Sequence, residues 1–272
     1  MVTGALSTLF RLRVTVSYAV MLVAVATTLL MLGPGVRELV ISRMSTNLHN
    51  LEHGRLGTLI GSAFVTENGP IWVWLPGLVC LLALAELLWR SGRVLVTFAI
   101  GHVGATLIVT AGLAAAIHVG WLPISVARAS DVGISYGAVA VLGALTAGIP
   151  SRWRPAWVGW WLAVGLLVVC AGVVGAPPAS GGFTDAGHVV ALLLGIVLSL
   201  RLGTAARWTR VRVALFAVGV AFGYLVLANT GLSLVAAPIA GIAGALAAHW
   251  LAGRRRARRP RPALAAAAAL TT

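Results

Sequence analysis

The chain is organised around residues 132–149, which read VGISYGAVAVLGALTAGI and contain no charged side chain. Glycine and alanine would occupy most sides of this segment in a helix, and small residues let membrane helices approach one another closely. We therefore predict a central membrane helix that is packed by neighbours on every side. Ser135 lies near its start, and Asp131 is expected to cap it.

The composition predicts an all-α, polytopic membrane protein. Of the 272 residues, 60% are hydrophobic and only 10% are charged, whereas a soluble domain has about 25% charged residues. Such a chain cannot cover its surface with polar side chains. A membrane-spanning helix needs about 20 mainly apolar residues. We expect eight spans, near 14–33, 71–89, 94–118, 132–149, 156–176, 187–203, 212–228 and 232–251.

Arginine placement predicts the topology. The formal net charge is +14, and all 20 basic residues are arginine. If the N-terminus is cytosolic, sixteen of the 20 arginines fall on the cytosolic side, which positive residues favour. We therefore expect cytosolic termini and a multi-pass protein of the bacterial plasma (inner) membrane. The arginine clusters are expected to contact anionic lipid headgroups rather than nucleic acid.

Three regions are expected along the chain. Residues 1–203 form the six-helix membrane core, residues 204–253 form two additional transmembrane helices, and residues 254–272 form a basic, then alanine-rich tail that we expect to be disordered. Within the core, residues 34–70 form the longest external connection. Their mixed apolar and polar pattern predicts amphipathic segments in the headgroup region.

Several polar residues have local interpretations. Glu86 is expected to pair with Arg90, one helical turn later. His49 and His53 are four residues apart, but no third ligand is evident, and we predict neither a metal site nor a cofactor. His102 is expected to be a buried hydrogen-bond partner.

Ser135 and His188 together indicate nucleophilic chemistry. His188 begins the sixth predicted span, and an ionisable residue within a span usually faces the interior of the bundle. Taken alone, Ser135 could bond back to a carbonyl group one turn earlier, and His188 could bond to a loop. Both residues, however, lie within about one turn of the same predicted membrane surface, on helices that are rich in small residues.

This pattern resembles the rhomboid family of intramembrane serine proteases. The resemblance lies in the nucleophile motif of the fourth core helix and the histidine motif of the sixth. It covers about residues 10–203 and implies a six-helix core, to which the last two spans are an extension. The positions that carry it are Gly133, Ile134, Ser135, Ala140 and Gly143 in the fourth helix, with His188 and Gly195 in the sixth.

The resemblance implies an intramembrane serine endopeptidase with a Ser135–His188 dyad. Ser135 would attack the scissile carbonyl group of a membrane-helix substrate, and His188 would take the proton of the hydroxyl group. Gly133 and Tyr136 would support the oxyanion through backbone N–H groups, with Asn68 as a further candidate donor. The residues expected to pack the helices are Gly137, Gly143, Gly187, Ala191 and Gly195.

The chain departs from the family pattern where the oxyanion is supported. Active rhomboids typically carry a His and an Asn, four residues apart, at the outer end of the second core helix. The corresponding residues 68–75 read NGPIWVWL and offer neither at the expected positions. Tyr136 and Ala191 also stand where the family usually has glycine. Loss of one oxyanion donor can lower the rate by about 10²–10³-fold.

Two alternatives therefore stay open. The chain could be an inactive rhomboid-like pseudoprotease that binds the transmembrane helices of client proteins, which requires the fold but no oxyanion hole. It could also be a small transporter or transporter subunit, although the sequence has no ionisable pair at mid-membrane and no clear internal repeat.

Overall fold

The computed structural model describes residues 11–66, 69–175, 182–203, 208–228 and 231–257, and these ranges are almost entirely helical, without a strand. The predicted all-α class is therefore confirmed. The long helices are α2 (Arg13–Leu32), α6 (Ile71–Trp89), α7 (Ser91–His118), α9 (Arg154–Gly175), α10 (Gly182–Ser199), α11 (Arg210–Leu227) and α12 (Gly231–Ala257). The shorter helices are α3 (Pro34–Met44), α4 (Leu48–Glu52), α5 (Thr58–Gly61) and α8 (Ser135–Ala144), with 3-10 turns η1 (Ser62–Phe64), η2 (Ile124–Arg128) and η3 (Leu145–Gly148).

The seven long helices are apolar enough to cross a membrane, so the protein is a multi-pass membrane protein. The fourth predicted span is shorter than expected, because α8 and η3 together cover only residues 135–148. At 1.5 Å per residue for α8 and about 2.0 Å for η3 this is about 23 Å, less than the roughly 30 Å of a hydrocarbon core. Gly133 explains the late start, since its φ of 130° does not belong to a helix.

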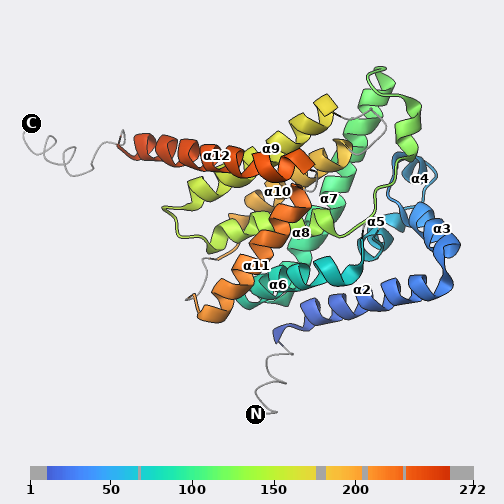
Figure 1. Ribbon diagram of the computed structural model, residues 1–272, viewed down its shortest axis with the longest axis horizontal. Coiled ribbons are helices and arrows are strands. Elements are labelled where there is room, and N and C mark those ends of the chain that lie inside the picture. The colour runs from blue at the N-terminus through green and yellow to red at the C-terminus, as the bar shows by residue number, and fades with distance from the viewer. Residues whose placement is uncertain (1–10, 67–68, 176–181, 204–207, 229–230, 258–272) are drawn as a thin grey trace, which may run out of the picture.

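Helix α8 lies at the centre of the bundle, as predicted. Every residue from 136 to 148 is buried, and the helix packs mainly against α7 and α10, with further contacts to α6 and α11 (Figure 1). The contact between α8 and α10 is close because it is made by glycine. A side-chain carbon added at Gly195 would overlap the carbonyl oxygen of Ala140, and one added at Gly143 would overlap the carbonyl oxygen of Leu192.

The two C-terminal helices pack against different helices of the core. Helix α12 lies along α9, and α11 lies along α6 (Figure 1). Helix α11 also reaches the central helix, where Gly223 faces the side chain of Leu142. These two helices therefore enlarge the same bundle rather than forming a separate layer.

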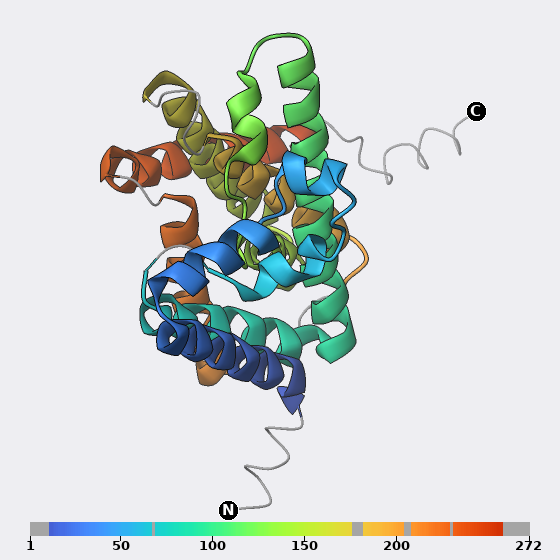
Figure 2. The ribbon, with the colours of Figure 1, turned by 90° about the vertical axis from the view of Figure 1, so that its right-hand side faces the viewer.

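The long connection between α2 and α6 is folded into α3, α4, α5 and η1, which lie beside α2 and α7 (Figure 2). Backbone bonds join it to the segment that precedes α8. The N–H group of Thr46 donates to the carbonyl group of Asp131 at 2.9 Å, and the N–H group of Asp131 donates to Ser45 Oγ at 2.8 Å. The N–H group of Gly133 donates to the carbonyl group of Ser62 at 2.9 Å.

The predicted ion pair between Glu86 and Arg90 is wrong. Helix α6 ends at Trp89, and Arg90 turns the chain with a φ of 71°, so Arg90 does not continue the helix on the face of Glu86. The buried carboxylate of Glu86 instead accepts hydrogen bonds from Val14, Thr15 and Ser91.

Candidate functional site

Ser135 is the first residue of α8 and is half-buried. The first backbone N–H groups of a helix have no acceptor within the helix, so donors lie close to this hydroxyl group. The predicted cap by Asp131 is wrong, because the N-cap residue of α8 is Ile134, three residues later. The backbone of Asp131 is held by Ser45 and Thr46 instead, which fixes the residue before the helix begins.

His188 lies in the first half of α10 and is only 3% exposed. Neither Nδ1 nor Nε2 has a hydrogen-bond partner among the described residues. It follows that Ser135 and His188 lie on adjoining helices but are not hydrogen-bonded to each other. The imidazole ring packs edge-on against the ring of Tyr136 instead, with 5.3 Å between the ring centroids and 81° between the ring planes.

Tyr136 fills the space between α8 and the start of α10. Its ring lies so close to Gly187 that a side-chain carbon there would overlap the phenol group, which gives a physical reason for glycine at that position. The Tyr136 hydroxyl group is buried and makes no regular hydrogen bond within the described part of the chain. The ring of this tyrosine therefore contacts the imidazole ring of His188.

Two carboxyl groups lie near the same end of α8. Asp185 is in the first turn of α10, where the helix dipole favours a negative charge. Asp131 lies in the loop before α8, and burial raises the pKa of its carboxyl group from 3.8 to about 6, with the nearby Tyr136 hydroxyl group opposing part of this shift. Tyr136 is thus a common neighbour of Asp131 and His188, and Asp185 lies close enough to interact electrostatically with it.

The structure gives the surroundings of two of the expected sources of oxyanion support, Gly133 and the start of α6. The N–H group of Gly133 is already used by the carbonyl group of Ser62. Asn68 lies outside the described residues. The first turn of α6 carries no histidine, asparagine, hydroxyl or charged side chain: Ile71 is buried, and Trp72 and Val73 are exposed.

The remaining predicted packing residues lie at helix contacts. Gly137 faces the ring of Phe98 in α7, and Ala191 in α10 is fully buried. No group of three metal-ligating side chains occurs within the ranges that the structure describes. His53 Nδ1 lies 2.7 Å from the carbonyl oxygen of His49, so one of the two imidazole groups is engaged locally.

A second Ser–His pair was not predicted. Ser62 Oγ lies 3.1 Å from His102 Nε2, and both residues are buried. The prediction that His102 is a buried hydrogen-bond partner is confirmed, but its partner is 40 residues away, so no local spacing could reveal it. Because Thr46 also bonds to the Ser62 hydroxyl group at 2.8 Å, this pair anchors η1 to α7 rather than exposing a nucleophile.

Comparison with known proteins identifies one family. A family model described as rhomboid-like protein matches residues 12–224, which include α2 to α10 and most of α11. Neither the curated proteins nor the solved structures contain a significant match.

Proposed function

Because this chain belongs to the rhomboid-like family of membrane proteins, we propose that it binds the transmembrane helices of client proteins without cleaving them. The observation that carries the proposal is the unpaired imidazole group of His188. A serine nucleophile needs a base within hydrogen-bond reach, about 2.6–3.2 Å. Ser135 has no such bond to His188, whose neighbour is the Tyr136 ring.

The surroundings of Ser135 also offer less side-chain support for an oxyanion than the family pattern provides. The N–H group of Gly133 is occupied, and the start of α6 has neither the histidine nor the asparagine of the family pattern. Each missing oxyanion donor lowers the rate by about 10²–10³-fold. In addition, neither Ser135 nor His188 lines the cavities of about 530 and 400 Å³ that the described residues form beside α2.

The packing of α11 supports a helix-binding role. This helix lies beyond the predicted six-helix core, and it docks on α6 and α8 through small residues. Phe222 packs over Gly77 of α6, and Leu142 of α8 packs over Gly223. Small residues are a common means by which membrane helices associate, because they bring the backbones close together. We propose that a client helix is bound by contacts of this kind.

An intramembrane serine protease is the second candidate. The observation in its favour is again His188, because a buried side chain with two unpartnered nitrogen atoms is rare and requires an explanation. In this alternative, a change in the Ser135 or Tyr136 side chain on substrate binding would bring the hydroxyl group to the imidazole group. Ser135 would then attack, and His188 would take its proton.

A paired experiment distinguishes the two candidates. Detergent-purified wild type, Ser135→Ala and His188→Ala are treated with a fluorophosphonate probe, beside an active rhomboid in the same detergent. The same proteins, carrying a fluorophore, are reconstituted with a labelled single-span peptide that contains a Gly-xxx-Gly motif, and energy transfer and cleavage are measured.

We expect no labelling, no cleavage, and equal energy transfer for the wild type and Ser135→Ala. A control peptide with leucine in place of both glycines is expected to bind more weakly. Probe labelling that is lost in both variants, together with peptide cleavage, would replace our proposal by the protease. Equal transfer for both peptides would contradict binding through small residues.

A further inference from the structure

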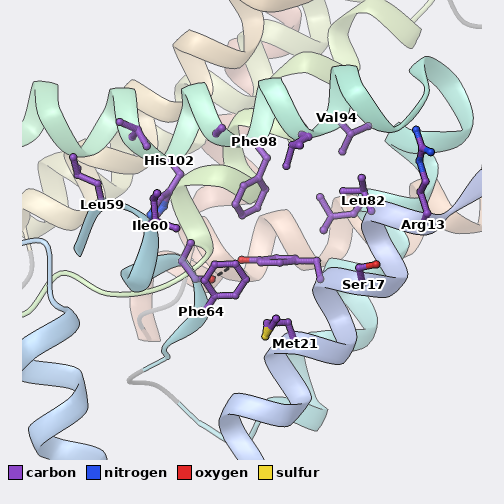
Figure 3. A pocket seen from close by; sticks show the side chains of 16 residues that line it. Arg13, Ser17, Met21, Leu59, Ile60, Phe64, Leu82, Val94, Phe98 and His102 are labelled. Carbon is purple, nitrogen blue, oxygen red and sulfur yellow. Dashed lines mark hydrogen bonds between the residues drawn. The ribbon is translucent and has the colours of Figure 1, made fainter. Parts of the chain in front are cut away.

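An apolar cavity of about 530 Å³ lies between α2, α7 and the α5–η1 segment (Figure 3). Its central wall is aromatic, because the ring of Tyr18 packs edge-on against Phe64 and Phe98, with centroid distances of 5.4 and 5.2 Å. The Tyr18 hydroxyl group donates to the carbonyl group of Ala63 at 2.5 Å, so its polar atom is already engaged. The cavity therefore suits an apolar occupant.

The opening of this cavity is also apolar. Met21, Ile60 and Leu95 line it and are 51%, 68% and 55% exposed. These residues belong to α2, α7 and the segment between them, and α2 and α7 are both long enough to cross the membrane. In a membrane protein, large exposed apolar side chains on such helices contact lipid, so the cavity opens toward lipid chains.

One end of the cavity carries a positive charge. Arg13, the first residue of α2, is exposed and lies at this end, with Ser17 one turn along the helix, whereas Leu59 and His102 lie at the other end (Figure 3). Arg13 Nε donates to Ser91 Oγ at 3.2 Å, which holds the guanidinium group beside the opening. A guanidinium group binds phosphate oxygens with favourable, often bidentate geometry.

We propose that this cavity binds a single glycerophospholipid, with an acyl chain against Tyr18, Phe64 and Phe98 and the phosphate group at Arg13. The long apolar wall and the cation at one end match the two parts of that ligand. The cavity is within the range of about 300–1,000 Å³ that is usual for small-molecule sites. This site is separate from Ser135 and His188, so the proposal does not depend on the function proposed above.

The apolar part of the site is tested by filling it. Ala99 lines the cavity and is exposed, so Ala99→Trp places an indole group in the cavity without changing the buried core. Ala111 is an exposed alanine of the same helix outside the cavity, and Ala111→Trp is the matched control. The retained phospholipid is measured by native mass spectrometry of detergent-purified protein.

We expect the wild type and Ala111→Trp to retain a phospholipid and Ala99→Trp to lose it. Equal retention by the two tryptophan variants would overturn the proposal. It would show that the lipid is bound elsewhere on the surface.

The polar part of the site is tested with Arg13→Gln and with Arg93→Gln, an exposed arginine near the same membrane surface that does not line the cavity. Binding of phosphatidylglycerol is measured by titration into the detergent-solubilised, delipidated protein. A lost charge-assisted hydrogen bond predicts about tenfold weaker binding for Arg13→Gln and no change for Arg93→Gln. Equal weakening in both variants would show only a general attraction to charge and would overturn the assigned phosphate contact.

Discussion

Glu86 caps the N-terminus of α2 from a different helix, through Thr15. The backbone N–H group and the Oγ1 hydroxyl group of Thr15 both donate to Glu86 Oε2, at 2.9 and 2.7 Å, and the N–H group of Val14 donates to Oε1 at 3.0 Å. A negative charge is favourable at the N-terminus of a helix, where N–H groups lack intrahelical acceptors. The carboxylate therefore fixes the start of α2 against the α6–α7 turn.

We expect Glu86→Gln to destabilise the protein by about 2 kcal/mol, because hydrogen bonds to a charged acceptor are stronger than those to an amide oxygen. The measurement is the thermal midpoint in detergent, compared with Glu38→Gln, whose side chain is exposed. Equal midpoints for the two variants would contradict a capping role for Glu86.

The Ser62–His102 bond predicts a structural phenotype. Ser62→Ala leaves His102 Nε2 buried without its partner, and Nδ1 already has none among the described residues. An unsatisfied buried polar group costs about 1–3 kcal/mol, so this variant should unfold earlier on heating. Ser42→Ala is the control, since the Ser42 hydroxyl group makes only an exposed, local bond to Leu39. If both variants unfold like the wild type, the connection between α2 and α6 is not held by this pair.

The sequence predicts the helical class because apolar runs are local and long. The central helix is predictable for the same reason, since Gly143 and Gly195 belong to patterns of small residues that are visible within one segment. The start of α8 is not predictable in this way. It depends on a bond from the N–H group of Thr46 to the carbonyl group of Asp131 and on one from the N–H group of Gly133 to the carbonyl group of Ser62, and both partners are distant in the chain.

In the candidate site, too, the local features can be predicted from the sequence and the long-range contacts cannot. A sequence can place Ser135 and His188 on helices at similar depth, but it does not specify which side chain of α8 meets the imidazole group. That depends on the direction of the Tyr136 ring, which is set by packing against Gly187. The partner of Glu86 was missed because Thr15 lies 71 residues away, whereas the expected pair considered only one turn of helix.

The close contact between α8 and α10 predicts a strong effect of a single methyl group. Gly195→Ala would overlap the carbonyl oxygen of Ala140 and force the helices apart, and overpacking of this kind costs about 1–3 kcal/mol. Gly112→Ala in α7 is the matched control because open space surrounds that position. There the higher helix propensity of alanine predicts equal or greater stability. A lower thermal midpoint for Gly195→Ala, together with an equal or higher midpoint for Gly112→Ala, would support the contact. A wild-type midpoint for Gly195→Ala would contradict it.

Asp131 predicts that stability depends on pH. Burial raises the pKa of its carboxyl group to about 6, so the folded protein favours the protonated form. The resulting stabilisation is fully present below the unfolded-state pKa of about 4. It is lost as the pH rises through about 6, by up to about 3 kcal/mol. Asp131→Asn keeps the shape of the side chain but cannot ionise. We therefore expect this variant to gain thermal stability relative to the wild type at pH 7.5 and to show little difference at pH 4.

The thermal midpoint of Asp131→Asn is measured in detergent at several pH values between pH 4 and pH 7.5 and is compared with that of the wild type. Glu52→Gln, which changes an exposed carboxyl group, should follow the wild-type profile. Because Thr46 and Ser45 bond to the backbone of Asp131 rather than to its carboxyl group, the substitution should leave the loop before α8 in place. A constant difference between Asp131→Asn and the wild type across this range would show that the carboxyl group does not titrate there.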